Sequence, residues 1–446
     1  MTQVNSGFFR LLMVILTTLA LGFPKPMQAQ DANLDNLNSQ ALLLINAQNG
    51  QILFERDADQ ALDVGSLSKL LLVYEVYDAI ASGKIQLTDR VAISNEAYSL
   101  SQDYNISNAP LRQDFDYTVQ ELLTLVAVGN ANGATLALSQ HLEVNEDEMI
   151  LRLNERLRQW GLKDFRLLNV TGLPEDYDGA SAFEDYQGPT NRLSAEALAT
   201  ISYRLINDFP EYLALTSKLD YQLKADTEDA FPLENQLAVL EGGSQSLEGT
   251  KGLAMASHPA LGYSQILYLN RDNQHIIAIS LASNVEEDQM FYAASQVAEY
   301  GLVAFETKTL LVKGKVTQEI PLIDVWGGKS LALETVYGED LVLSVPRGDA
   351  SHKLSYQHAL LPELARDTDT LNAPIQAGQV VGYVGVYDDQ AKLSFISQAS
   401  GNEIPIVANY DVDDIGTVGR TLQWIGRFFS NIITEVRRFF LNLFNA

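Results

Sequence analysis

Strand-like segments lie at both ends of residues 30–308, with helical segments between them, and this order limits the folds open to the chain. Near the start, two apolar runs at 41–45 and 51–55 are separated by an Asn-Gly turn, which predicts a hairpin. Strand-like runs return at 265–269 and 276–281. A sheet that takes strands from both ends of one domain and packs against helices indicates an α/β fold, an α+β sandwich.

The helical middle begins with a run from Ser66 to Ser82, whose apolar residues recur every three or four positions. Gly83 follows as the expected stop. Helical spacing continues to about residue 205, with a polar, glycine-containing loop at 174–190. After the returning strands, one more helix is predicted from Glu287 to Lys308.

From residue 309 the pattern changes to short strand-like runs separated by turns. These runs predict a small all-β domain at 309–415. A chain of 446 residues is long enough for two or more domains. The strand-like runs lie at 310–312, 341–345, 380–386 and 393–396.

Residues 1–29 have the layout of a signal peptide. Arg10 precedes an apolar run at 11–23, and Pro24 and the small residue Ala29 follow. The run is short for a membrane span, so we expect cleavage near Ala29, with a retained N-terminal anchor as the alternative. The chain is therefore predicted to be exported.

Residues 416–446 predict a C-terminal amphipathic helix. Their apolar side chains recur every three or four positions, and four arginines stand against one glutamate. A basic, aromatic-rich segment on an acidic protein is typical of a helix that lies in the plane of a membrane surface. The alternative is a helix that packs on the β domain or self-associates.

The composition excludes several classes of protein. A net charge of −27 argues against nucleic-acid binding, which needs a basic face. The chain has no cysteine, so disulfides, thiolate metal sites and cysteine nucleophiles are excluded. Its five histidines show no HExxH-like spacing, and we expect neither a metal site nor a cofactor. An exported protein without cysteine suits the outer surface of a Gram-positive cell.

Ser66 and Lys69 are the first candidates for chemistry, at the beginning of the first long helix. Residues three apart share a helix face, so the two side chains lie next to each other. A serine hydroxyl needs a base to become a nucleophile, and a lysine desolvated by apolar neighbours can act as one because its pKa falls. Residues 70–72, all leucine, supply such neighbours. The alternative is a helix-capping serine beside a solvated lysine.

Further motifs follow this pair in a definite order. They are the stretch Asn-Val-Thr-Gly-Leu-Pro at 169–174, the helix start Ser-Ala-Glu-Ala-Leu-Ala at 194–199 and, in the β domain, residues 371–375 and 378–382. With the hairpin, the Ser-Leu-Ser-Lys segment and the C-terminal helix, they resemble the low-molecular-weight penicillin-binding proteins. These are the serine D-alanyl-D-alanine carboxypeptidases of peptidoglycan maturation.

The resemblance implies a fold and a division of the chain. We expect a serine transpeptidase/β-lactamase-like catalytic domain at 30–308, followed by the β domain at 309–415 and the anchor helix at 416–446. Ser66 takes the place of the family's nucleophile, and Lys69 that of its base.

The chain departs from the resemblance at two other family motifs. Where the family has Ser-x-Asn, this chain has Asn130-Ala131-Asn132. Asn132 is expected to bind the substrate amide, whereas Asn130 replaces a serine that relays a proton, and a carboxamide cannot pass a proton as a hydroxyl does. Simple turn or helix-cap residues are the alternative for both asparagines.

The second departure falls at the family's Lys-Thr/Ser-Gly strand. The matching residues are Thr250, Lys251 and Gly252. The resemblance gives Lys251 the task of attracting the substrate carboxylate, with a plain surface lysine as the alternative. Gly252 offers no hydroxyl, and Thr250 can replace it only where a bulge turns it to the same face of the strand.

The predicted function is that of a serine D-alanyl-D-alanine carboxypeptidase. Its substrate would be the peptidoglycan pentapeptide, with β-lactams as inhibitors and an acyl-enzyme at Ser66. The alternative is a catalytically impaired relative that binds muropeptide or β-lactam, or a membrane-tethered scaffold.

Overall fold

The computed structural model describes residues 34–426 and 428, except for 144, 226, 229, 259–260, 319–321, 349–353, 389–391 and 400. The predicted signal peptide at 1–29 lies outside the described residues. The same is true of residue 427 and of residues 429–446 in the predicted anchor helix.

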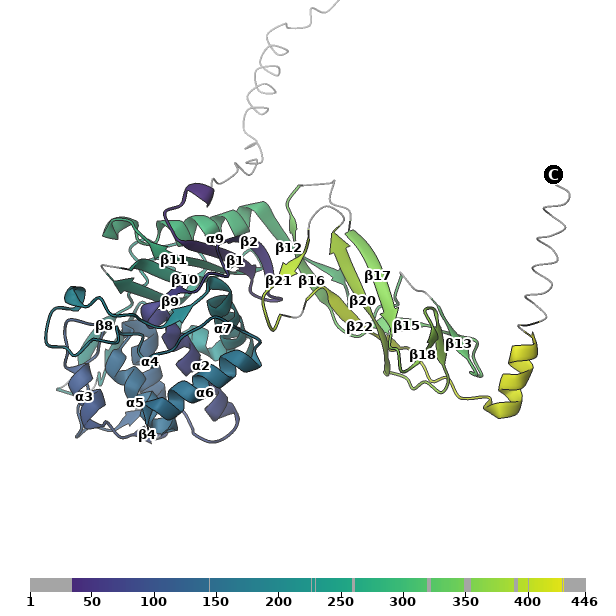
Figure 1. The fold of residues 1–446 in the computed structure, drawn as a ribbon, viewed down its shortest axis with the longest axis horizontal. Coiled ribbons are helices and arrows are strands. Elements are labelled where there is room, and N and C mark those ends of the chain that lie inside the picture. Colours follow the sequence, from purple (N-terminus) through teal and green to yellow (C-terminus); the bar gives the residue numbers. More distant parts are fainter. Residues whose placement is uncertain are drawn as a thin grey trace, which may run out of the picture. The chain divides into compact units, whose positions relative to one another are not determined.

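The central sheet of the first domain has the strand order β21-β2-β1-β11-β10-β9, with neighbours antiparallel (Figure 1). The predicted hairpin is confirmed by β1 and β2. Strand β1 pairs along its other edge with β11, so strands from both ends of the domain share one sheet, as the sequence predicts. The strands are β1 Ala41–Asn46, β2 Gln51–Arg56, β9 Thr250–His258, β10 Gly262–Arg271, β11 Gln274–Ser283 and β21 Ser394–Phe395.

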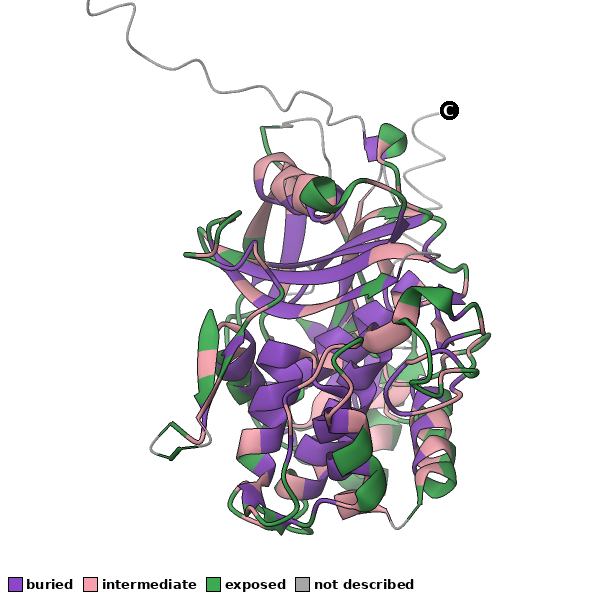
Figure 2. Ribbon diagram, turned by 90° about the vertical axis from the view of Figure 1, so that its left-hand side faces the viewer, coloured by how far each residue is buried: buried purple, intermediate pink, exposed green. Residues whose placement is uncertain are grey.

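Helices cover both faces of this sheet. Helix α9 lies on one face, and the remaining long helices form a layer on the other (Figure 1). The buried residues concentrate in the sheet and in the helices next to it (Figure 2). The helices are α2 Lys69–Ala81, α3 Asn95–Ser101, α4 Val119–Gly129, α5 Asn132–Leu142, α6 Glu146–Gln159, α7 Ala195–Asp208, α8 Leu213–Thr216 and α9 Tyr292–Ala304.

Helix α2 runs through the middle of the helical layer. It is apolar on nearly every side, which is typical of a buried helix rather than a surface one. Glu75, fully buried within it, is bound by Arg152 Nε at 2.6 Å and Arg156 Nε at 2.5 Å, both from α6. These charge-assisted bonds satisfy a carboxylate that would be costly to bury alone. Gly83, just beyond the helix, has a φ of +74°, which favours glycine and fits the predicted stop.

Short two-stranded ladders tie the loops of this domain together. They pair β3 with β6, β4 with β5, and β7 with β8. The strands are β3 Leu62–Asp63, β4 Arg90–Val91, β5 Tyr117–Thr118, β6 Arg192–Leu193, β7 Asp220–Leu223 and β8 Phe231–Glu234.

The C-terminal part is built of strands around its own apolar core, as the sequence predicts. Two sheets have the orders β14-β13-β19-β18 and β15-β22-β20-β17, and β12 pairs with β16. The strands are β12 Phe305–Leu311, β13 Ile323–Trp326, β14 Ala332–Leu333, β15 Thr335–Tyr337, β16 Leu341–Pro346, β17 Leu354–Leu360, β18 Ala365–Asp367, β19 Thr370–Asn372, β20 Val380–Asp388 and β22 Glu403–Ala408.

Two predicted segments differ from the structure. The helix predicted to reach Lys308 ends at Ala304, because β12 begins at Phe305 and its backbone pairs with β16. The strand-like run at 393–396 contributes β21, which pairs with β2 in the central sheet. In both places the partner strand is distant in sequence, so local spacing could not reveal it.

Candidate active site

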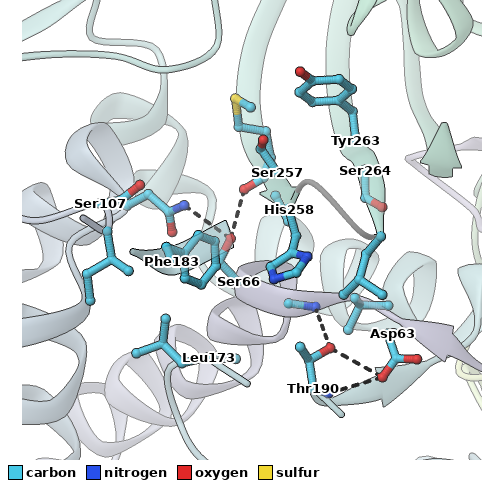
Figure 3. A pocket seen from close by; sticks show the side chains of 18 of the residues that line it. Asp63, Ser66, Ser107, Leu173, Phe183, Thr190, Ser257, His258, Tyr263 and Ser264 are labelled. Atoms are coloured by element: carbon cyan, nitrogen blue, oxygen red, sulfur yellow. Dashed lines mark hydrogen bonds between the residues drawn. The ribbon is translucent and has the colours of Figure 1, made fainter. Parts of the chain in front are cut away.

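Ser66 lies in a 3₁₀ turn, Gly65–Ser68, that leads directly into α2. Gly65 has a φ of +51°, and the neighbouring stretch 169–174 packs closely against it: a Cβ on Gly172 would lie 2.0 Å from the Gly65 carbonyl oxygen. This close approach requires glycine at position 172. The turn leaves Ser66 half-buried on the wall of a cavity, where its Oγ donates a hydrogen bond to the Met255 carbonyl at 3.1 Å (Figure 3).

Lys69, one turn into the interior, is the candidate base. Its side chain is only 3% exposed. Burial holds the pKa of the Lys69 amine well below its usual range, which favours the neutral form that can accept a proton. Its Nζ donates to the backbone carbonyl of Asn130 at 2.6 Å and to the side-chain Oδ1 of the same residue at 2.8 Å.

Asn130 links the other two groups. It stands between α4 and α5 in a left-handed conformation (φ +51°), which asparagine tolerates better than most residues. Its Nδ2 donates to Ser66 Oγ at 3.1 Å while its oxygens accept from Lys69. Within the described residues, no hydrogen bond joins Lys69 Nζ to Ser66 Oγ directly. The structure therefore brings Ser66, Lys69 and Asn130 together, with the carboxamide of Asn130 between the amine and the hydroxyl.

Asn132 begins α5 and lines the same cavity. Its Nδ2 donates to the Ser107 carbonyl at 3.1 Å. Its Oδ1 is buried, and no described residue donates a hydrogen bond to it. A buried acceptor without a partner is costly, so this oxygen is suited to accept an N–H from a ligand.

The cavity has a volume of about 430 Å³. One wall is the edge strand β9, from Met255 to His258, and the opposite wall includes residues 105–107 and the Ser66 turn. The rings of Phe183 and His258 pack edge to face, with 4.8 Å between their centroids (Figure 3). Burial lowers the pKa of His258. The remaining lining mixes apolar side chains with uncharged polar ones and two carboxylates, Asp63 and Glu287.

The structure does not bring Thr250 or Lys251 to this cavity. Lys251 Nζ is bound to Glu241 at 2.8 Å, and its side chain is 41% exposed. The pairing of β9 with β10 skips Lys251, which therefore forms a bulge. Thr250 nevertheless stays buried and does not line the cavity. The bulge therefore does not place the Thr250 hydroxyl where the missing hydroxyl of residue 252 would be.

This part of β9 is packed against α8 instead. Thr216 Oγ1 donates to the Lys251 carbonyl at 2.7 Å. A Cβ on Gly252 would lie 2.5 Å from Thr216 Oγ1, which leaves no room for a hydroxyl side chain at that position. Thr250 and Lys251, the two residues of this stretch expected to bind substrate, therefore lie outside the cavity, and the strand contacts Ser66 further along, at Met255.

Several cavity residues were not foreseen from the sequence. Gln236 accepts from Asn130 Nδ2 at 3.4 Å and donates to Ser107 Oγ at 2.8 Å. Thr190 donates to Asp63 through its backbone N–H at 3.1 Å, below the Ser66 turn (Figure 3). None of these residues stands in a recognisable motif, and only the folded chain brings them beside Ser66.

An α+β domain with a Ser-x-x-Lys helix against the sheet, followed by a β domain, defines the penicillin-binding class of proteins. Residues 27–254, more than half of the chain, match the family described as D-alanyl-D-alanine carboxypeptidase (Peptidase S11). Residues 305–414 match the family described as the C-terminal domain of penicillin-binding protein 5. The chain belongs to the D-alanyl-D-alanine carboxypeptidase family, whose members act on peptidoglycan.

Individual relatives cover nearly the whole chain at low identity. The D-alanyl-D-alanine carboxypeptidase DacF of Bacillus subtilis is 21% identical over 91% of this chain and 96% of its own length. DacA of Escherichia coli is 23% identical over 94% of this chain and 96% of its own length. Relatives thus come from cells with different envelopes, and the expected Gram-positive source is not supported.

Solved structures share the fold. A peptidoglycan synthesis regulatory factor (PBP3) from Streptococcus pneumoniae is 26% identical, with a TM-score of 0.69 over 85% of this chain and 100% of that one. Penicillin-binding protein 5 from Haemophilus influenzae is 22% identical, with a TM-score of 0.67 over 88% of this chain and 100% of that one.

Proposed function

We propose that this chain is a serine-type carboxypeptidase that removes the terminal D-alanine of peptidoglycan stem peptides through an acyl-enzyme at Ser66. The observation that carries the proposal is the link from the buried, pKa-lowered amine of Lys69 through Asn130 to the half-exposed hydroxyl of Ser66. A neutral amine and a nucleophilic hydroxyl at the wall of a peptide-sized cavity are what acyl transfer needs. β-Lactams, whose strained amide resembles the substrate bond, would acylate the same serine.

The reaction would run in two halves. Ser66 Oγ attacks the carbonyl carbon while its proton moves to the neutral Lys69 amine, and the proton then passes to the leaving nitrogen as the C–N bond breaks. Water hydrolyses the ester in the second half. This chemistry needs neither a metal nor an organic cofactor.

The edge strand β9 supports stabilisation of the oxyanion. The Met255 carbonyl accepts from Ser66, so this residue faces the nucleophile across the free edge of the sheet. In an antiparallel strand the N–H and C=O of one residue point to the same side. We assign the oxyanion hole to the backbone N–H groups of Ser66 and Met255.

Asn130 is expected to make turnover slow, and its replacement tests the proposal. The protein should release D-alanine from diacetyl-L-Lys-D-Ala-D-Ala, and Asn130→Ser should raise the rate by about 10- to 100-fold, because a hydroxyl can relay the proton. Serine is less suited than asparagine to the left-handed conformation, so the variant should also lose about 1 kcal/mol of stability. D-Alanine release and thermal unfolding measure the two effects.

Asn130→Ala provides the matched control, since it removes the carboxamide without adding a hydroxyl. It should not gain activity. If the alanine variant is as fast as the serine variant, removal of a steric block explains the gain and Asn130 does not occupy a relay position. If wild type and both variants release no D-alanine, the chain is an impaired relative that at most binds the peptide.

The C-terminal segment supports attachment to a membrane surface outside the cytoplasm. Residues 416–426 are helical, and Arg420 and Gln423 fix the helix to the β domain through Ala373, Asp414 and Gly327. Apolar side chains of this helix point to solvent, among them Val418, Leu422, Trp424 and Phe428. No helix among the described residues is both long and apolar enough to cross a bilayer. An in-plane anchor fits these features.

A chain that ends at Gln423 tests the anchor. It keeps the contacts of Arg420 and Gln423, so its melting temperature should match that of the longer protein. It should no longer float with anionic vesicles, because the exposed aromatic residues and later arginines are gone, and each arginine near the surface contributes about 1 kcal/mol. Flotation of the truncated chain would place the anchor elsewhere, such as an uncleaved N-terminal segment. Misfolding would show that residues after Gln423 are needed for the fold of the β domain and would contradict the anchor.

A further inference from the structure

The leaving residue of the substrate must lie on the Asn130 side of Ser66. The proton taken from Ser66 returns to the leaving nitrogen from Lys69, and the Lys69 amine lies behind Asn130, which bonds both to it and to Ser66 Oγ. Four residues that line the cavity there are linked by hydrogen bonds, and we call the side chains of Ser107, Asn130, Asn132 and Gln236 the amide cluster. All four are uncharged, and three are carboxamides.

The charges around the cavity are unfavourable to an anion. Among the described residues that line it, none is lysine or arginine, and the acidic ones are Asp63 and Glu287. Lys69 lies behind Asn130 and does not line the cavity, and burial lowers the pKa of its amine. His258 also favours its neutral form, since burial lowers its pKa. A free carboxylate on the leaving residue would therefore meet no lysine or arginine among the described lining residues.

The basic residue expected to fill this gap is held elsewhere. Lys251 is bound to Glu241 outside the cavity, and the strand near it packs on Thr216. The amide cluster offers N–H donors and carbonyl acceptors instead, including the unpartnered Asn132 Oδ1. A peptide or carboxamide group, which both donates and accepts, matches this lining better than a carboxylate, which only accepts.

We infer that the site does not depend on a free carboxylate on the leaving residue, and that it therefore also cleaves D-Ala-D-Ala bonds followed by a neutral carboxamide. A neutral carboxamide follows the bond when the terminus is amidated or when the peptide chain continues past the bond. The enzyme therefore has endopeptidase activity as well as carboxypeptidase activity. This inference rests on the proposed carboxypeptidase function. Ser66 Oγ forms the ester as the C–N bond breaks, the leaving nitrogen takes the serine proton, and water then restores Ser66 and a free carboxyl group.

The test compares diacetyl-L-Lys-D-Ala-D-Ala with its C-terminal carboxamide on the mature chain. We expect kcat/KM for the carboxamide to equal or exceed that for the free acid. A charged anchor would instead favour the acid by about 10- to 100-fold. Lys251→Ala should leave both rates unchanged. Gln236→Arg, which places a cation in the amide cluster, should shift the ratio toward the acid by about tenfold or more, whereas the neutral Gln236→Met should not shift it.

A preference for the acid of tenfold or more that disappears in Lys251→Ala would overturn the inference and leave the carboxypeptidase proposal standing. If neither peptide is cleaved, calorimetry with the Ser66→Ala variant decides. Binding of the carboxamide at least as tight as that of the acid supports the inference, and tighter binding of the acid contradicts it. Binding of neither peptide overturns the proposed function and this inference together.

Discussion

The Ser66→Ala variant should form no covalent adduct with benzylpenicillin, whereas the unchanged protein should gain the mass of one drug molecule per chain. Ser66 Oγ is the hydroxyl that faces the cavity beside the candidate base, so its removal leaves no group to attack the lactam carbonyl. Intact-mass spectrometry after incubation with the drug reads out the result directly. The effect is complete loss rather than a reduction, because an ester cannot form without the oxygen.

Ser68→Ala is the matched control, two residues along the same turn. Ser68 Oγ is buried, donates to the Gly65 carbonyl at 2.8 Å and accepts from Asn191 at 2.8 Å, so it supports the turn without facing the cavity. This variant should keep the adduct and lose only about 1 kcal/mol of stability. An adduct that persists in Ser66→Ala, or that disappears equally in Ser68→Ala, would contradict the assignment of the nucleophile.

The Lys69→Met variant should acylate about 100- to 10,000-fold more slowly, the range for removal of a positioned proton-transfer group. Methionine has a similar length and suits an apolar site, so the nucleophile and cavity stay in place. Stopped-flow or timed mass measurements of adduct formation give the rate. Acylation within tenfold of wild type would show that another group takes the proton from Ser66.

The same variant should change two pH profiles. In the unchanged protein, acylation should rise with pH as Lys69 loses its proton, and it should do so below the ordinary lysine pKa of about 10.4, because burial lowers the folded-state pKa. The unfolded chain then binds more protons than the folded one between the two pKa values, so stability should increase with pH over that window. The rise of the acylation rate with pH and the rise of stability with pH should both be absent in Lys69→Met. They should persist in Lys84→Met, which changes a solvent-exposed lysine just after α2.

Much of the scaffold around the site could be predicted from local patterns. The Asn-Gly hairpin and the apolar spacing after Ser66 predict β1, β2 and α2, and Gly83 marks the end of that helix. The spacing of Ser66 and Lys69 likewise places them on one helix, although it does not show that a third residue lies between their side chains. Signals of this kind depend on residues within a few positions of one another, which is why the sequence alone carries them.

Other features depend on contacts between distant segments, and here the sequence was insufficient. The helix before the β domain ends four residues early because β12 pairs with β16, and β21 joins a sheet whose other strands lie before residue 284. Gln236 and Ser107 reach the site from loops that no motif distinguishes.

The sequence by itself determined the class of fold, the order of its elements and the Ser66–Lys69 pair, because these follow from turn residues and helical periodicity. Only the tertiary structure decided which residues of β9 face the nucleophile. The alternation of residues along a strand assigns its side chains to the two faces of the sheet. The bulge at Lys251 and the packing of Gly252 on Thr216 then set which residue of β9 reaches Ser66. That residue is Met255. Tertiary packing also decided the charge of the cavity. It buries Lys69 behind Asn130 and pairs Lys251 with Glu241, so neither lysine is among the described residues that line the cavity.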